Sequence, residues 1–315
     1  YAAAGLSAIV FFFAAIIPFN EAITEKLSQL TERGFSPSAL NTYINCPLDF
    51  YFKYILQIKE TEEVEEIIEA SSLGTFVHDV LETFYKPYIN KIITVDQIKS
   101  LLPEIEEKTL KAFKTKYKER EITYGKNLLI FRVAVKFIQN FLKQEISLLT
   151  ELKKRNQSLT LLALEQPLEA EFSCNELKFK IRGKADRIDK IGNVVRIIDY
   201  KTGLVEQKNL NLDNLDEITS DRKFAKPLQL LVYALLYHKM NPVSGHDLQS
   251  GNISFRKLSA GFMPVTLKKE NILSTGLFND FENQISGLIN EMLDPELQFS
   301  HQPESEYCTF CEVDS

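Results

Sequence analysis

The stretch Ile181–Gly203 reads IRGKADRIDKIGNVVRIIDYKTG and holds the most informative pattern of the chain. Apolar residues recur among charged ones before a short run, Lys190–Asn193, that contains one glycine, and apolar β-branched residues follow it. This pattern predicts a β-hairpin over residues 177–201 that turns at Lys190–Asn193. The charged residues of the hairpin therefore lie on strands, where the position of each residue decides the face that its side chain occupies.

Two carboxylates of this hairpin fall on one face of the predicted sheet. Successive side chains of a strand point to opposite faces, so Asp199 and Lys201 share a face. If the turn centres near residues 191 and 192, Asp186 lies opposite Ile197, diagonal to Asp199 and on that same face. Diagonal neighbours have Cα atoms roughly 7–8 Å apart. The two carboxylates could then share one hard cation.

Such an arrangement suits the cleavage of a phosphodiester. A divalent cation polarises the phosphoryl oxygen and lowers the pKa of the attacking water, and two carboxylates can bind Mg²⁺ while leaving positions for water and phosphate. A lysine two residues beyond one ligand can orient the water or stabilise developing charge. The spacing alone fits equally well a surface ladder of ion pairs that joins Asp199 to Lys201 or Lys184, and both interpretations stay open at this point.

Composition narrows the class of protein. The 315 residues are 44% hydrophobic and 25% charged, with 12 Gly and 11 Pro, which excludes a collagen-like, low-complexity or largely disordered chain. The net charge of -6 argues against coating of nucleic acid by the whole surface, but it allows a local basic groove. Four cysteines are too few for a disulfide scaffold. The first residue is not Met, and we expect a fragment of a longer protein.

Residues 1–20 carry no charge and are long enough to span a bilayer. Ser7 and Pro18 interrupt the run, no positive region precedes it, and no Lys/Arg bias flanks it. We therefore expect no membrane segment, assign no chemistry to residues 1–34 and expect the protein in the cytoplasm.

The order of helical and strand patterns predicts a mixed α/β core. A helix follows the Ser36–Pro37 start signal and ends near Asn45, and a second begins near Ser71. The remaining expected elements are helices within 95–154, strands from 159, a helix at 227–239, a strand at 252–255 and a helix at 277–292.

Five segments, in order, resemble the motifs of the PD-(D/E)XK nuclease superfamily and are most similar to its RecB-like branch, the AddB-type nuclease domain of helicase–nuclease complexes. They are Phe35–Pro47 followed by Phe50, Gly74–His78, Arg182–Asp189, Ile198–Gly203 and Gln229–Tyr233. The resemblance implies a restriction-endonuclease-like α/β core, a central mixed sheet flanked by helices. It also implies one nuclease domain over 35–315 with a large helical insertion at about 86–158.

The resemblance also implies roles for individual residues. The implied metal ligands are His78, Asp186, Asp199 and the carbonyl of Tyr200; the implied catalytic residues are Lys201, Asp199, Asp186, Gln229 and Tyr233. Lys201 would act as base or orient the water, and Gln229 and Tyr233 would position the strand or Lys201. Without the resemblance, His78 would be interpreted as an exposed helix residue and Tyr233 as core. Glu165 is a candidate auxiliary carboxylate that could equally face solvent.

Three cysteines match the ligand pattern of the [4Fe–4S] cluster that many nucleases of this type hold: Cys46, Cys308 and Cys311. Such a cluster normally takes four thiolates, and the fourth would lie just past Ser315. The pattern leaves open a cut chain, a member that has lost the intact cluster, or a three-cysteine zinc site. Cys174 lies in a strand region and is interpreted as a buried apolar residue.

These implications define an expected function. We expect a Mg²⁺- or Mn²⁺-dependent deoxyribonuclease, an exonuclease, that acts on single-stranded DNA or duplex ends within a helicase–nuclease of DNA repair and recombination. The sequence contains no Gly-x-x-x-x-Gly-Lys-Ser/Thr loop, so a helicase motor would lie on another segment or subunit. The alternatives are a catalytically silent DNA-binding or scaffolding protein of the same fold and a CRISPR-type iron–sulfur exonuclease. The complete set of Asp186, Asp199 and Lys201 argues against the silent protein.

Overall fold

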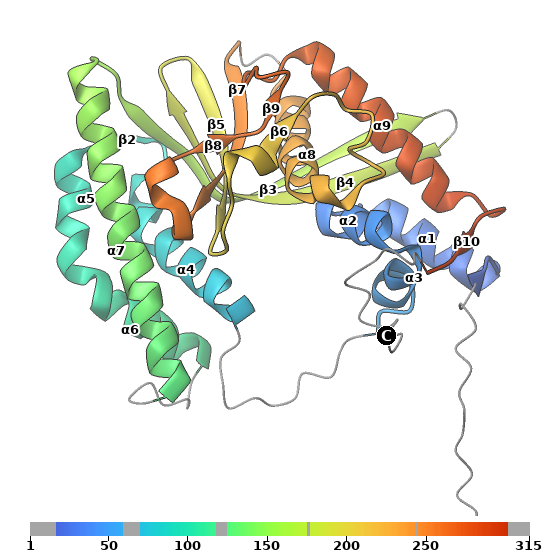
Figure 1. Cartoon of the computed structure of the whole chain (residues 1–315), viewed down its shortest axis with the longest axis horizontal. Helices are drawn as coiled ribbons and strands as arrows, with labels where there is room; N and C mark the ends of the chain where they lie inside the picture. The colour runs from blue at the N-terminus through green and yellow to red at the C-terminus, as the bar shows by residue number, and fades with distance from the viewer. Residues whose placement is uncertain (1–16, 59–69, 118–124, 175–176, 243–244, 302–315) are drawn as a thin grey trace, which may run out of the picture.

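The computed structural model describes residues 17–58, 70–117, 125–174, 177–242 and 245–301. Its centre is a six-stranded mixed sheet in the order β2-β3-β4-β5-β7-β8, in which only the β5–β7 pair is parallel (Figure 1). The strands are β2 (Lys91–Ile93), β3 (Leu159–Cys174), β4 (Leu177–Ile191), β5 (Val194–Lys201), β7 (Asp247–Ser254) and β8 (Met263–Pro264). The mixed α/β core is therefore as the sequence predicts.

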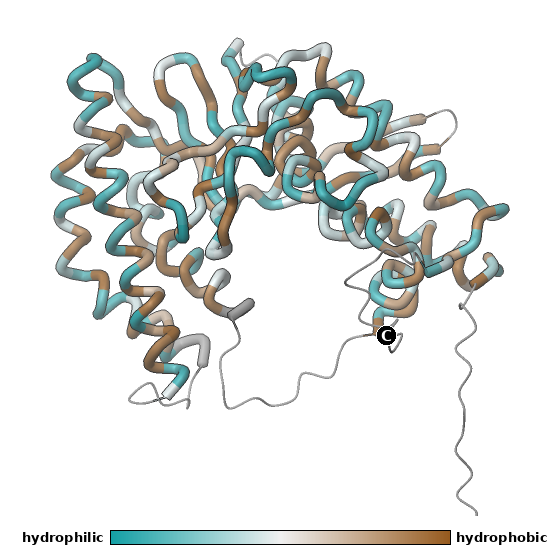
Figure 2. The backbone as a smooth tube through the Cα atoms, viewed as in Figure 1, coloured by the Kyte–Doolittle hydropathy of each residue, from teal (hydrophilic) through white to brown (hydrophobic). Residues whose placement is uncertain are grey.

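Helices cover both faces of this sheet (Figures 1 and 2). Two separate hydrophobic cores lie between the helices and the sheet. One face is covered by α1 (Glu21–Arg33), α2 (Pro37–Asn45), α3 (Pro47–Phe50), α8 (Ala225–Met240) and α9 (Thr275–Leu293). The other is covered by α4 (Ala70–Tyr85), α5 (Val95–Leu101), α6 (Ile105–Tyr117) and α7 (Gly125–Lys154). A π-helical turn spans Tyr51–Ile55, and 3₁₀ turns span Lys86–Tyr88, Leu102–Glu104, Gln207–Leu210, Arg222–Phe224 and Phe255–Ala260. None of the helices in these described ranges combines the length and the hydropathy needed to cross a bilayer.

The β4–β5 hairpin has a tighter turn than the sequence indicated. Gly192 adopts φ +59°, which glycine reaches without strain, and the chain reverses within two residues so that Ile191 pairs with Val194. The expected pairing of Asp186 with Ile197 is wrong, because Ile197 pairs with Ile188. A shift of two residues leaves every side chain on its expected face.

Two expected boundaries also differ. The strand expected at 252–255 begins at Asp247, because it pairs in parallel with the whole of β5. The stretch expected to be a helical insertion includes β2, which pairs with β3 and so joins the central sheet. The division of the chain into a segment 1–34 and a domain 35–315 stays a prediction, although α1 packs Ile23, Leu27 and Leu30 into the first core.

Backbone pairing ties the early helices to the hairpin. Ser36 caps α2 by accepting a hydrogen bond from the Ala39 amide, and Pro37 occupies the first helical position, as expected. Phe35, just before this cap, donates its amide to the Lys180 carbonyl and accepts from the Arg182 amide, each at 2.9 Å. The segment that precedes α2 is thereby fixed beside β4.

Small sheets complete the fold. The β1 strand (Ile17–Pro18) pairs with β10 (Gln298–Phe299), so residues near the two ends of the chain lie side by side. A second small pair joins β6 (Asn211–Leu212) to β9 (Thr266–Leu267).

Candidate functional site

Helix α4 places His78 at the open end of the β4–β5 hairpin, opposite the turn. His78 Nδ1 lies 3.5 Å from Asp186 Oδ1, and His78 Nε2 lies 3.2 Å from the carbonyl oxygen of Tyr200. Gly74, one turn earlier, faces the segment after β5: a methyl group added there would be in van der Waals contact with Thr202 Oγ1, at 3.4 Å. Burial opposes protonation of His78, but the hydrogen bond and charge of Asp186 outweigh it and raise the pKa of the imidazole.

Glu165 completes a group of potential ligands with these residues. One ligand atom from each of His78, Glu165 and Asp186 lies within 4.8 Å of the other two. Glu165 is half-buried and has φ +47°, shortly after a bulge between Leu161 and Ala163 in β3. Burial raises the pKa of its carboxyl, and the ion pair with Lys184 partly opposes this rise.

Asp199 is a buried residue, 4% exposed, and lies close enough to His78 and Asp186 for their charges to shift its pKa, but its carboxylate is not one of the three grouped ligands. Its Oδ2 accepts hydrogen bonds from Lys201 Nζ at 2.8 Å and from Asn252 Nδ2 at 2.7 Å. Burial raises the pKa of Asp199 to about 6, and the charge of Lys201 opposes part of this rise. Asp186 uses its second oxygen, Oδ2, to accept the Tyr200 amide at 2.6 Å.

A chain of hydrogen bonds holds Lys201 from α8. Lys201 Nζ donates to Gln229 Oε1 at 3.0 Å, and Gln229 Nε2 donates to Tyr233 Oη at 2.8 Å. A methyl group on Gly183 would lie 2.7 Å from the Tyr233 ring, so this glycine makes room for the ring against β4. The structure thus brings Gln229 and Tyr233 to Lys201 and Asp199.

The donor set suits a hard divalent cation. Carboxylate oxygens and an imidazole nitrogen converge at the group formed by His78, Glu165 and Asp186. The raised pKa values of Asp199 and Glu165 reflect buried negative charge that a cation would stabilise. Within the described part of the chain, the buried Asn252 Oδ1 has no hydrogen-bond partner, which leaves an acceptor for a bound water.

A sequence profile of the PD-(D/E)XK nuclease superfamily matches residues 34–315. The chain belongs to the PD-(D/E)XK nuclease superfamily. The profile covers all of the site residues just described.

Relatives of the chain are consistent with this superfamily. A protein of Carboxydothermus hydrogenoformans, described as a subunit of an ATP-dependent helicase/deoxyribonuclease, is 26% identical over 243 residues, which cover 72% of this chain and 20% of that protein. A protein of Clostridium tetani with the same description is 27% identical over 212 residues, 64% of this chain and 17% of that protein. An uncharacterised protein of Rickettsia bellii is 22% identical over 300 residues, 90% of this chain and 32% of that protein. The chain therefore spans only about a sixth to a third of the length of these relatives.

Two site residues of this superfamily member were not anticipated from the sequence. Asn252 fixes Asp199 from the neighbouring strand β7, and Gly183 accommodates Tyr233. A sheet order that places β7 beside β5 was needed to find Asn252. Gly183 did carry a signal, because a glycine inside a strand often marks a close approach of another group.

The cysteine motif is only partly within the described residues. Cys46 is fully buried at the end of α2, and its Sγ lies 3.7 Å from His301 Nδ1. Cys308 and Cys311 lie outside the described residues, seven and ten positions after His301 in the sequence. The predicted grouping of the three cysteines stays a prediction. Cys174 is half-buried at the end of β3, where its Sγ accepts a hydrogen bond from Asn290.

Proposed function

We propose that this chain is a Mg²⁺- or Mn²⁺-dependent deoxyribonuclease domain that hydrolyses phosphodiester bonds from DNA ends. The observation that carries the proposal is the position of Lys201. It pairs with Asp199 at 2.8 Å and with Gln229 at 3.0 Å, beside a group of three potential metal ligands. A silent scaffold has no need to hold a lysine in this way.

Each residue has a distinct role in this proposal. His78, Glu165 and Asp186 would hold the cation. The Tyr200 carbonyl, and the Asp199 carboxylate whose Oδ2 already accepts from Lys201 and Asn252, would be further oxygen ligands. The cation would polarise the scissile phosphoryl group and lower the pKa of a bound water. Lys201 would orient that water or stabilise the negative charge that develops on the phosphate, and Gln229 would fix the direction of its ammonium group.

The larger assembly is also a proposal. The two relatives described as parts of a helicase/deoxyribonuclease are about five to six times as long as the region that they share with this chain. We propose that this domain works in the same kind of helicase–nuclease of DNA repair and recombination. The helicase motor would lie on another segment or subunit.

The test compares variants that separate metal binding from catalysis. Lys201→Ala should lower cleavage of end-labelled DNA by a factor on the order of 10²–10³ and leave the affinity for Mn²⁺, measured by calorimetry, largely intact. Asp186→Asn should lose both cleavage and Mn²⁺ binding. Lys154→Ala removes a lysine that forms an exposed ion pair at the end of α7 and serves as control. Cleavage by Lys201→Ala at the wild-type rate would refute the assignment.

We further propose that Cys46 is one thiolate ligand of an iron–sulfur cluster shared with Cys308 and Cys311. In support, His301, seven positions before Cys308, already lies beside Cys46: its Nδ1 is 3.7 Å from Cys46 Sγ. Iron and acid-labile sulfide should copurify with the full-length protein, and Cys46→Ala should lose both. Cys174→Ala should retain them. A zinc content that replaces iron would instead support the zinc site.

A further inference from the structure

The face of the sheet opposite the acidic site carries a buried network of charges. Arg187 and Tyr200 directly follow Asp186 and Asp199 along their strands, so their side chains point to the other face. Arg187 is 1% exposed even though its guanidinium carries a full charge. A charge buried this deeply is stable only when it is paired and hydrogen-bonded.

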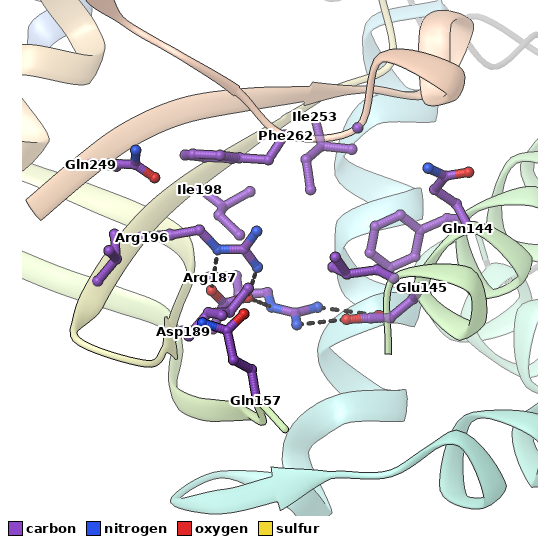
Figure 3. A pocket seen from close by; sticks show the side chains of 15 residues that line it. Gln144, Glu145, Gln157, Arg187, Asp189, Arg196, Ile198, Gln249, Ile253 and Phe262 are labelled. Atoms are coloured by element: carbon purple, nitrogen blue, oxygen red, sulfur yellow. Dashed lines mark hydrogen bonds and ion pairs between the residues drawn. The ribbon is translucent and has the colours of Figure 1, made fainter. Parts of the chain in front are cut away.

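The partners of Arg187 come from the sheet and from the helical layer. Its Nε donates to Asp189 Oδ2 at 2.9 Å, and its Nη2 donates to Glu145 Oε1 of α7 at 2.6 Å (Figure 3). Its Nη1 donates to Glu145 Oε2 at 3.3 Å and reaches Tyr200 Oη at 3.5 Å. Arg196 completes the set with two hydrogen bonds to Asp189, so two guanidinium groups balance two carboxylates.

Helix α4 is attached to the same network. The hydroxyl of Tyr85 donates to Glu145 Oε2, and the Arg187 guanidinium lies over the Tyr85 ring at 4.9 Å. Tyr85 follows His78 by seven residues, two helical turns on the same side of the helix. One face of α4 therefore supplies a candidate metal ligand and, two turns later, an anchor in the network.

Tyr200 provides a second connection through the sheet. Its amide donates to Asp186 at 2.6 Å, and its carbonyl oxygen lies 3.2 Å from His78 Nε2. On the opposite face its ring meets Phe141 of α7 edge-on, with ring centroids 5.5 Å apart, and its hydroxyl lies by Arg187. A movement of this side chain would move the backbone atoms that contact the acidic site.

The network lies at a level where direct packing between α7 and the sheet is incomplete. A cavity of about 440 Å³ opens here between α7 and the strands, and Glu145, Arg187, Asp189 and Arg196 form part of its wall (Figure 3). In a close-packed core, direct contact between side chains is enough to fix a helix relative to a sheet. Beside this cavity the charged groups link the helix to the sheet, in addition to the contact between Phe141 and Tyr200.

We propose that Glu145 and Arg187 are positioning residues for the acidic site. They act through Tyr85 and Tyr200, and they set the distance between His78 on α4 and Asp186 on β4. The inference rests on the proposed function, because it assumes that His78 binds a metal ion. The helical layer then serves the site by holding His78 in place from the far side of the sheet.

The test measures metal affinity, because a loss of activity alone would not separate positioning from stability. Mn²⁺ binding to the full chain is titrated by calorimetry, and the site is defined as the one that His78→Ala removes or weakens. Tyr85→Phe removes only the hydroxyl that joins α4 to Glu145. It should weaken Mn²⁺ binding by up to about tenfold, where the effects of residues that directly support metal ligands begin, because Tyr85 acts one step further from His78. Glu145→Gln should weaken it at least as much.

Tyr43→Phe is the matched control. Tyr43 is also a buried tyrosine that donates to a helix glutamate, Glu291 Oε1 at 3.1 Å, but it lies in the other core. This variant should bind Mn²⁺ as the wild type does. If Glu145→Gln does not fold, Tyr85→Phe still carries the test, since phenylalanine keeps the ring in place.

A double-mutant cycle gives the decisive outcome. If Tyr85 acts through His78, the double variant His78→Ala/Tyr85→Phe should bind Mn²⁺ no more weakly than His78→Ala. Additive losses, or an unchanged affinity in Tyr85→Phe, would overturn the positioning role while leaving the nuclease proposal intact. A wild-type protein without a His78-dependent Mn²⁺ site would overturn both.

Discussion

Glu165 holds its carboxylate at the acidic site with a backbone angle of φ +47°, in the left-handed region that L-residues other than glycine rarely adopt. Such a conformation costs on the order of 1–3 kcal/mol and persists where the surrounding structure imposes it. Here the neighbouring strand β4 and the ion pair with Lys184 hold the residue in place. The negative charge of the nearby Asp186 raises the pKa of the half-buried Glu165 carboxyl further.

Replacement of Glu165 by glycine should therefore separate stability from metal binding. Glu165→Gly relieves the strained backbone and removes a half-buried charge, so we expect the free energy of unfolding without metal to rise by about 1 kcal/mol. The affinity for Mn²⁺ should fall at least about tenfold. Urea unfolding and calorimetry measure the two effects.

Glu171→Gly, on an exposed position of the same strand, is the control for this substitution. Glycine in a regular strand costs roughly 0.5–1 kcal/mol, so the control should lose stability and keep its metal affinity. A loss of stability in Glu165→Gly as large as in the control would contradict the role of strain.

At the scale of elements, strand β4 and helix α8 lie so close together at Gly183 that a side chain at this position would collide with the Tyr233 ring. Gly183 lies under the ring of Tyr233, and the hydroxyl of that tyrosine continues the hydrogen-bond chain to Gln229 and Lys201. The packing of a helix on a strand thus sets the direction of a side chain two hydrogen bonds away.

Gly183→Ala should disturb both packing and catalysis. Its methyl group would lie 2.7 Å from the Tyr233 ring, a distance at which the ring must move. Overpacking of this kind costs about 1–3 kcal/mol, and the displaced ring should lower the cleavage rate through Gln229 and Lys201. Denaturant unfolding and the nuclease assay report the two losses.

Gly287→Ala makes the same glycine-to-alanine change where we expect stability to rise and cleavage to stay normal. Gly287 is exposed in α9, and a methyl group there meets nothing within 4 Å. Alanine in a helix is more stable than glycine by about 0.5–1 kcal/mol, so this variant should gain stability and cleave normally. If Gly183→Ala behaves like Gly287→Ala, the close approach of Tyr233 does not constrain the site.

At the scale of the whole molecule, residues near both ends of the described chain pack against each other in the core that contains α1, α2, α8 and α9. Phe299 of β10 is 2% exposed and stacks on Phe19, with ring centroids 5.1 Å apart. It also contacts Phe50 and Tyr51, which follow the buried Cys46. The β1–β10 pair is thereby attached to the aromatic segment that follows α2.

Phe299→Ala should accordingly destabilise the whole domain. Truncation of a buried phenylalanine costs about 3–5 kcal/mol, and here it removes ring contacts to three separate aromatic residues. Leu297→Ala, at a side chain that is 42% exposed, should change stability by less than about 0.5 kcal/mol. Equal midpoints of urea unfolding for the two variants would show that the chain ends contribute little to the core.

The sequence by itself determined the order of the main helices and strands, but not β2, and the face that each charged residue of the hairpin occupies. Both follow from local rules: Ser36 and Pro37 start α2, and period-two alternation places Asp199 and Lys201 on one face. The motif order also predicted that His78 and Gln229 would lie near this hairpin, and the structure places both there. Their part in metal binding and catalysis stays a prediction.

Only the tertiary structure decided how far the two strands slide past each other and what lies on their reverse face. Alternation is unchanged by a shift of two residues, so the pairing depended on the positive φ of Gly192. The left-handed backbone of Glu165 has no signal in residue type, because glutamate rarely adopts it. The contact of Arg187 with Glu145 joins residues 42 positions apart, and only the packing of α7 on the sheet brings such distant charges together.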